Sequence, residues 1–355
     1  MKRILLVFSL IIVLVAAHAQ ETFKVVKDIP HTSVKNQQMA GTCWAFATTS
    51  YLESELMRKG TGEFDLSELF FVYYAYMMKM DNFIRLKGLA NFSQGGQAHD
   101  VFAVFDKYGA VTETDFNGLA PGDSIFDHTE MEGILKAMGK YWAAQSKPGK
   151  YWMRATRAIL DTYLGTMPNE ITFKKKTYTP IEFRQAVVSL KSSDYVELTS
   201  FSHHPYYQPF RLEIPDNWMG AQYYNLPIDE LMDVINYAMD NGYTICWDGD
   251  VSEKQFKHRS NYARLDDEDV KLTQSLRQKD FDDFVTTDDH LMHMVGLSED
   301  STGNRYYIIK NSWGTESNSN GGYLNMSRGF VYMKTVAILI HKDAIPEKIR
   351  KKLGV

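Results

Sequence analysis

Several features that mark particular classes of protein are missing from this sequence of 355 residues. Basic residues are not in excess, because 39 Lys and Arg stand against 44 Asp and Glu, for a formal net charge of −5. Scattered basic residues and this charge exclude the basic surface that nucleic-acid binding requires. The chain has no internal repeat and no low-complexity tract. After residue 17 no apolar run is long enough to cross a bilayer, so we expect no stable membrane anchor.

Cysteine is scarce, since Cys43 and Cys246 are the only two in the chain. In an exported protein two cysteines favour a disulfide. That bridge would consume the Cys43 thiol, whose sequence context indicates a reactive group. We therefore predict that both thiols are free and that Cys246, in the strand-like residues 243–247, is a small buried apolar residue.

The N-terminus has the pattern of a targeting segment. Lys2 and Arg3 precede an apolar stretch over residues 4–17, and Ala17-His18-Ala19 fits a cleavage site. The pattern predicts a signal peptide over residues 1–19, a mature chain that begins at Gln20, and a periplasmic or secreted location. No cysteine follows the apolar stretch, which argues against a lipoprotein anchor.

Residues 36–47 are the most informative stretch of the chain. They place Cys43 at the start of a predicted helix, where the partial positive charge of the helix end lowers the pKa of a thiol. Gln37 lies six positions upstream, and its amide can donate a hydrogen bond to an oxyanion. A nucleophile and an oxyanion donor are two of the groups that acyl transfer requires.

A base and an orienting amide follow far downstream. His290 and His293 lie at the beginning of an apolar run that ends near residue 297. Asn311 lies at the end of a strand-like segment. A cysteine near the mature N-terminus with His and Asn far downstream is the order expected of a papain-like site.

Three motifs in the same order give the chain a family resemblance. They are Val34-Lys35-Asn36-Gln37, Gly41-x-Cys43-Trp44-Ala45-Phe46 and Asn311-Ser312-Trp313-Gly314. The chain resembles the papain-fold cysteine peptidases. The resemblance implies an α+β fold in which an N-terminal helical half and a C-terminal β-rich half enclose the active-site cleft.

The resemblance also assigns residue roles. His293 is the expected base, because its lead into Met294-Val295-Gly296 resembles the family strand that carries the catalytic histidine, and His290 is the alternative. Asn311 is expected to orient the base, with Trp313 shielding their hydrogen bond. Gly95 and Gly96, in a loop between two predicted helices, correspond to glycines that bind the substrate main chain as an added strand. Gly95, Gly96 and Trp313 are therefore the expected substrate-binding residues.

The long middle of the chain narrows the resemblance to one branch of the family. Residues 178–183, 224–229 and 247–251 look like segments of bleomycin hydrolase and aminopeptidase C, and the resemblance spans residues 30–347. We expect one peptidase domain over residues 20–355, with a branch-specific insertion at about 117–225. The branch implies an aminopeptidase for short peptides, without a cofactor, that assembles as a homohexamer whose C-terminal tail enters the cleft.

Three other functions stay open on the sequence alone: a papain-like endopeptidase, a non-proteolytic acyl transferase, and a catalytically retired binding or scaffold protein. A metal site is not predicted. His203 and His204 are adjacent, and neighbouring residues rarely chelate one ion without a spaced partner, which the sequence does not reveal.

The final third of the chain is predicted to be rich in strands. Residues 229–239 form a helix with one apolar stripe, and residues 305–309, 322–326 and 331–340 are β-prone.

Overall fold

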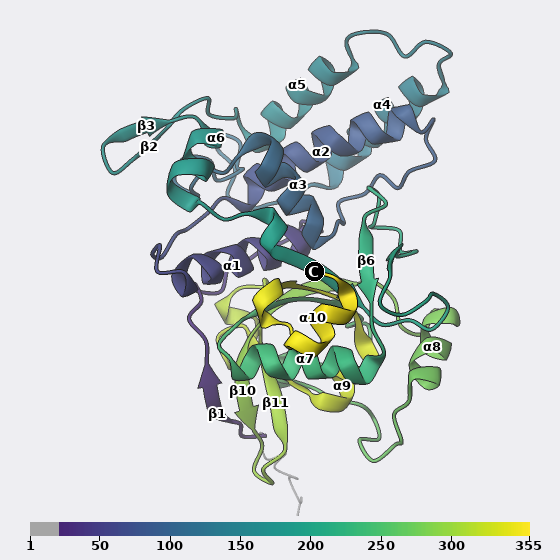
Figure 1. The fold of residues 1–355 in the computed structure, drawn as a ribbon. Helices are drawn as coiled ribbons and strands as arrows, with labels where there is room; N and C mark the ends of the chain where they lie inside the picture. Colours follow the sequence, from purple (N-terminus) through teal and green to yellow (C-terminus); the bar gives the residue numbers. More distant parts are fainter. Residues whose placement is uncertain (1–20) are drawn as a thin grey trace, which may run out of the picture.

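The computed structural model describes residues 21–355, so the signal peptide predicted over residues 1–19 lies outside the described part. A helical half packs against a β-rich half (Figure 1). The first helices of the helical half are α1 (Cys43–Arg58), α2 (Glu68–Arg85) and α3 (Ala98–Tyr108). The predicted α+β class is confirmed.

Local sequence signals explain where these helices begin. The side chain of Ser67 accepts a hydrogen bond from the backbone N–H of Phe70 at 3.0 Å and so caps α2. Gln97 and Asp100 form a capping box at the start of α3. The helix predicted to begin at Cys43 does begin there.

The middle of the chain adds to the helical half. Helices α4 (Thr129–Ala144) and α5 (Trp152–Leu164) pack against α2 and each other, and they form the top of the molecule in Figure 1. A small hairpin of β2 (Ile171–Phe173) and β3 (Lys176–Tyr178) leads into the short helix α6 (Pro180–Phe183) and a π-helical turn (Arg184–Val188).

The β-rich half is built on one large mixed sheet with the order β5-β6-β4-β13-β7-β10-β11-β12-β9-β8, and β1 also pairs with β10. Its strands are β1 (Lys24–Asp28), β4 (Tyr195–Thr199), β5 (Pro209–Arg211), β6 (Gln222–Asn225), β7 (Ile245–Gly249), β8 (Phe256–Lys257), β9 (Tyr262–Ala263), β10 (His290–Glu299), β11 (Arg305–Lys310), β12 (Tyr323–Ser327) and β13 (Thr335–His341). Helices α7 (Ile228–Asp240), α8 (Gln274–Asp282), α9 (Arg328–Lys334) and α10 (Glu347–Leu353) complete this half.

The side chains of β7 and β10 alternate between two cores. Leu291 and Cys246 belong to the core shared with the helical half, whereas Met292 and Trp247 belong to the core that α7 covers. In the antiparallel register Leu291 lies opposite Asp248, and His293 lies opposite Cys246. The face of β7 and β10 that carries Leu291 and Cys246 is therefore turned toward α1.

Most predicted elements of this half are confirmed, but one is wrong in part. The predicted helix over residues 229–239 is α7, and the segments near 305 and 322 are β11 and β12. Residues 331–334, predicted as strand, belong to α9. Ser327 accepts a hydrogen bond from the backbone N–H of Phe330 at 3.0 Å, and this cap starts a helix that runs to Lys334.

No helix among residues 21–355 is long and apolar enough to cross a membrane.

His128, which precedes α4, gives a prediction about acid stability. Its ring is buried, and neither ring nitrogen has a hydrogen-bond partner among residues 21–355, so burial lowers its pKa from 6.5 to about 4. Between these pH values the unfolded chain binds a proton that the folded chain does not, so stability falls as the pH drops from 6.5 toward 4. His128→Phe cannot take up that proton. We expect the variant to lose about 2 kcal/mol less stability than the wild type on acidification to pH 5, measured by urea unfolding at pH 7.5 and pH 5.

Equal losses of stability in the two proteins on acidification would show that His128 contributes nothing to the pH dependence.

Candidate active site

Cys43 opens α1, and its thiol meets the start of β10. The side chain is 9% exposed, and the backbone N–H of Leu291 donates a hydrogen bond to the thiol, which lowers the pKa of the thiol. Burial acts more strongly in the opposite direction and raises the pKa of Cys43 to about 12. Both cysteines are free, as predicted, and Cys246 is buried beside the hydroxyl of Thr48 at 3.5 Å.

His290 is the residue before Leu291, and it pairs with Asn311. The His290 Nε2 and Asn311 Oδ1 atoms are 2.7 Å apart. Asn311 Oδ1 also accepts from the backbone N–H of Ser312 at 2.7 Å, so this atom is the amide oxygen and His290 Nε2 carries the proton. That tautomer leaves His290 Nδ1 as a base. The ring of Trp313 lies 4.9 Å from the His290 ring, centroid to centroid, beside the bond to Asn311.

The prediction that Asn311 orients His293 is wrong. His293 is 0% exposed, and its Nδ1 lies 2.7 Å from the hydroxyl of Ser50, which also accepts from the Lys310 ammonium at 2.7 Å. Ser50 is seven residues along α1 from Cys43, a rise of about 10 Å. His293 is therefore about two helical turns from the thiol. Burial, and to a lesser extent the adjacent Lys310 charge, lower the pKa of His293 well below 6.5.

Gln37 is held rigidly at the other side of the site. Its backbone N–H donates to the carbonyl of Ser312 at 2.8 Å, and its Oε1 accepts from the Ser312 hydroxyl at 2.6 Å. One N–H of its amide donates to the carbonyl of Ala40 at 2.8 Å. The second amide N–H is left to donate elsewhere. Ser312 fixes this glutamine, and the sequence reasoning missed that role although Ser312 belongs to a quoted motif.

The buried side chain of Lys79 holds the loop of Gly95 and Gly96 by hydrogen bonds to its carbonyl groups. The ammonium of this buried lysine donates to the carbonyl of Ser93 at 3.0 Å and to that of Gly95, and the indole of Trp44 donates to the carbonyl of Gln94 at 3.0 Å. Lys79 also lies over the ring of Trp44, the residue after Cys43. The glycine loop and the start of α1 therefore form one packed unit.

Gly95 leaves room for an acidic side chain. A Cβ at this position would lie 1.8 Å from Oδ2 of Asp216, which bonds to Asn91 at 2.9 Å through its other oxygen. We expect Gly95→Ala to expel Asp216 and to cost about 1–3 kcal/mol of stability. The double variant Gly95→Ala/Asp216→Ala relieves the clash, so its melting temperature should exceed that of Gly95→Ala. A double variant no more stable than Gly95→Ala would contradict this packing.

The C-terminus does not lie beside Cys43. Val355 lines a surface groove with Arg58 and Lys59, at the far end of α1. Because α1 has 16 residues, its two ends are about 24 Å apart. Leu353 and Ile349 are buried in the core of the β-rich half and hold α10 there. In this structure the tail does not enter the cleft, contrary to the expectation from the branch resemblance.

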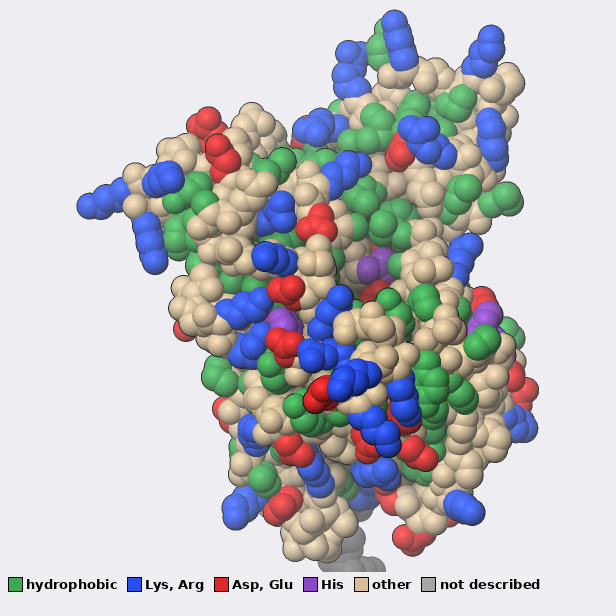
Figure 2. Space-filling view, viewed as in Figure 1, with side chains coloured by type: hydrophobic (Ala, Val, Ile, Leu, Met, Phe, Trp, Pro, Cys, Tyr) green, Lys and Arg blue, Asp and Glu red, His purple; other side chains and the backbone are tan. Residues whose placement is uncertain are grey.

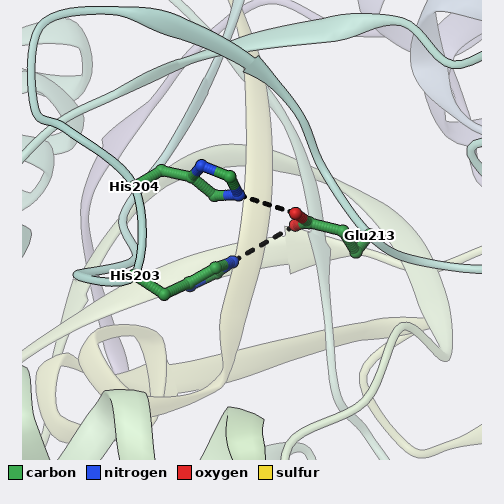
Figure 3. Close-up of side chains that lie close together, drawn as sticks. All are labelled: His203, His204 and Glu213. Carbon is green, nitrogen blue, oxygen red and sulfur yellow. Dashed lines mark hydrogen bonds and ion pairs between the residues drawn. The ribbon is translucent and has the colours of Figure 1, made fainter.

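His203 and His204 both bond to one carboxylate, that of Glu213 (Figure 3). Their Nε2 atoms lie 3.2 and 2.6 Å from its two oxygens. The expectation that the pair lacks a carboxylate partner is wrong. Glu213 follows β5, and the path of the chain through this strand places its carboxylate beside both histidines. Two imidazoles and a carboxylate are a donor set that suits zinc. Here the three side chains satisfy one another, and the His204 ring stacks on Phe210 at 4.1 Å between centroids.

Sequence comparisons place this fold and site in a known family. Residues 168–354 match the Peptidase C1-like family. The chain belongs to that family. Residues 20–118, which include Gln37 and Cys43, match the papain family of cysteine proteases. The chain is therefore a cysteine-type peptidase, and the predicted papain-like resemblance is confirmed.

The names of individual relatives support the aminopeptidase branch as well as the family. Aminopeptidase G of Lactobacillus delbrueckii subsp. lactis is 22% identical over 92% of this chain and 85% of its own length. Aminopeptidase C of Lactococcus lactis subsp. cremoris is 22% identical over 94% of this chain and 86% of its own length. The crystal structure of PepW from Lactobacillus rhamnosis HN001 superposes with a TM-score of 0.77 at 19% identity, over 94% of this chain and 84% of that one, which shows a shared fold.

The prediction of an exported protein is wrong. A Saccharomyces cerevisiae relative, 21% identical over 93% of this chain and 79% of its own length, is named a mitochondrial cysteine proteinase, which is an intracellular location. The export prediction depended on residues 1–19, which lie outside the described part of the chain.

Proposed function

We propose that this protein is an aminopeptidase that hydrolyses short peptides with Cys43 as nucleophile, His290 as base and Asn311 as the group that orients His290. One observation carries the assignment. His290, the first residue of β10, bonds to Asn311, and the backbone N–H of the next residue, Leu291, donates to the Cys43 thiol. The relatives named aminopeptidases support the substrate class.

The first step is a proton transfer from the Cys43 thiol to Nδ1 of His290. Burial raises the pKa of Cys43 and lowers that of His290 to about 4, so each charge alone is disfavoured. A thiolate and an imidazolium formed together stabilise each other, because their attraction is strong where water is excluded. The helix end at Cys43 and the N–H of Leu291 further stabilise the thiolate.

The thiolate then attacks the carbonyl of the bond to be cleaved. The free amide N–H of Gln37 and the backbone N–H of Cys43 donate to the oxygen that becomes negative. His290 gives its proton to the departing amine, and water hydrolyses the thioester. Gly95 and Gly96 are proposed to hold the substrate main chain, and Trp313 to keep water from the bond between His290 and Asn311.

Hydrolysis of coumarin-linked amino acids and peptides, in the presence of reductant, tests this function. We expect release of coumarin that depends on Cys43 and that stops after alkylation by iodoacetamide. An endopeptidase would cleave blocked peptides internally. A retired scaffold protein would release no coumarin from any peptide.

The homohexamer implied by the family resemblance remains a proposal, and sedimentation of the purified chain measures it.

A further inference from the structure

Three acidic side chains act on the thiol of Cys43 through their negative charge. Asp288, Asp248 and Asp216 each repel a negative charge on the sulfur and so raise the pKa of the thiol. They come from three separate segments: the residue pair before β10, the end of β7, and the loop that packs on Gly95. The space-filling view shows a hollow where the helical and β-rich halves meet (Figure 2). A nucleophilic thiolate gains nothing from such neighbours unless a cation joins them.

Asp248 is the least satisfied of these carboxyl groups. It is 2% exposed, and among residues 21–355 no group other than the carboxyl of Asp288 forms a hydrogen bond with its oxygens. It lies directly opposite Leu291 in the sheet, on the same side of β7 as Cys246, which faces α1. Cross-strand neighbours have Cβ atoms about 5 Å apart. Asp248 is therefore next to the residue whose N–H bonds to the thiol.

Asp288 lies against Asp248 at a more open position. It is only half-buried, and one of its oxygens accepts from the side-chain amide of Gln97 at 3.0 Å. Gln97 follows the glycine loop, so Asp288 joins that loop to the start of β10. Burial and repulsion by Asp288 raise the pKa of Asp248 well above 3.8. Burial and repulsion by Asp216 raise the pKa of Asp288 to about 7, although its hydrogen bond with Asp248 acts in the opposite direction.

The neighbouring acidic groups have their own partners. Glu197 pairs with the ring of His99 at 2.9 Å, and the indole of Trp218 donates to Asp100 at 2.6 Å. Asp216 accepts from Asn91 and Ser93. Within residues 21–355 no Lys, Arg or His forms an ion pair with Asp248 or Asp288. These two carboxyl groups therefore have no cation beside them, and a proton kept by the pair takes the place of one.

We propose that Asp248 and Asp288 bind the free α-ammonium group of the substrate's first residue. The inference rests on the proposed function and specifies how that function selects its substrates. The nitrogen of a first residue lies about 2.5 Å from its own carbonyl carbon. The attacking sulfur approaches that carbon to roughly 3–3.5 Å. An ammonium group in this position sits between the thiol and the two carboxyl groups.

Binding of the ammonium also prepares the nucleophile. When the ammonium binds, the proton that the carboxyl pair holds leaves to solvent, so the net charge of the pair with its cation is unchanged. The ammonium lies between the pair and the sulfur, so its positive charge is closer to the thiolate than the carboxylates are and favours that thiolate. Selection for a free amine and activation of Cys43 are thus produced by the same contact. A Lys or Arg side chain one residue upstream in a longer peptide offers the same chemistry, and the experiment separates the two sources.

The test compares wild type, Asp248→Asn and Asp288→Asn on three coumarin substrates: leucyl, N-acetyl-leucyl and N-acetyl-lysyl-leucyl. Wild type should prefer the free amine by at least about 100-fold in kcat/KM. Each variant should lose about 30-fold or more on the leucyl substrate, mainly through KM, and little on the blocked ones. Asp289→Asn is the control, because the Asp289 carboxylate bonds to Thr287 and Ser252 instead.

The amide variants keep the size of each side chain, and iodoacetamide verifies that the site is intact. Alkylation of Cys43 should be no slower in the variants than in wild type, because a repelling charge has been removed. Equal losses on all substrates, or slower alkylation, would overturn the inference. So would a selective loss on the lysyl-leucyl substrate, which would show that the pair binds the side chain of an upstream residue.

The same substrates separate this inference from the proposed function. If wild type cleaves leucyl and N-acetyl-leucyl substrates equally, the proposed ammonium site is wrong and the proposed peptidase function is unaffected. If it cleaves neither and Cys43 resists alkylation, the proposed function fails.

Discussion

His290→Ala should lower kcat by at least about 1,000-fold, whereas His293→Asn should retain activity within about fivefold of wild type. His290 is the imidazole that bonds to Asn311 beside the thiol, so its removal leaves Cys43 without a base and the departing amine without an acid. His293 bonds to Ser50 inside the protein, and asparagine can accept the same hydrogen bond. Steady-state hydrolysis of leucyl-coumarin measures both effects.

The two variants also need to be compared in folding. His293→Asn leaves a smaller side chain in a fully buried position, so we expect a lower melting temperature with activity retained. His290→Ala also truncates a buried side chain, so its melting temperature should fall as well, but this variant should be inactive at temperatures where it is fully folded. Activity in His290→Ala together with none in folded His293→Asn would reverse the assignment of the base.

Gln37→Ala should lower kcat about 100- to 1,000-fold with little change in KM, because its amide is proposed to act on the oxyanion that forms only during the reaction. The matched control is Ser312→Ala. Ser312 donates to Gln37 Oε1 at 2.6 Å, and its loss loosens the glutamine without removing the amide. We expect an intermediate loss in kcat for Ser312→Ala, measured on the same substrate.

If Gln37→Ala instead raises KM and leaves kcat unchanged, Gln37 binds the substrate and does not stabilise the oxyanion.

The sequence predicted the α+β fold, but it expected His293 beside Asn311, where the structure has His290, and the reason lies in the sheet. The turn near residue 302 pairs Glu299 with Arg305 and Gly296 with Ile308. Continued without interruption, this register would set His293 opposite Asn311. A β-bulge between Met294 and Gly296 shifts it by one residue, so His293 lies opposite Lys310. A shift of one residue moves a side chain to the other face of the sheet.

Gly296 in an otherwise apolar strand is a signal that can mark a bulge, but the sequence alone does not show that the register shifts there. The ammonium site was also beyond the sequence. Asp248 and Asp288 are 40 residues apart, and only the pairing of β7 with β10 brings them together. By contrast, the start of α1 at Cys43 and the stripe of α7 follow from local signals, because a helix depends on residues within a few positions of one another.

The acyl-enzyme on Cys43 tests the central claim most directly. The protein is mixed with leucyl-coumarin, and the reaction is quenched in acid within one turnover. The protein is then digested, and the mass of the peptide that contains Cys43 is measured by mass spectrometry. We predict a leucyl thioester on Cys43 in the wild type, and none in His290→Ala. An acyl group on another residue, or hydrolysis by wild type without any acyl group on Cys43, would contradict the account.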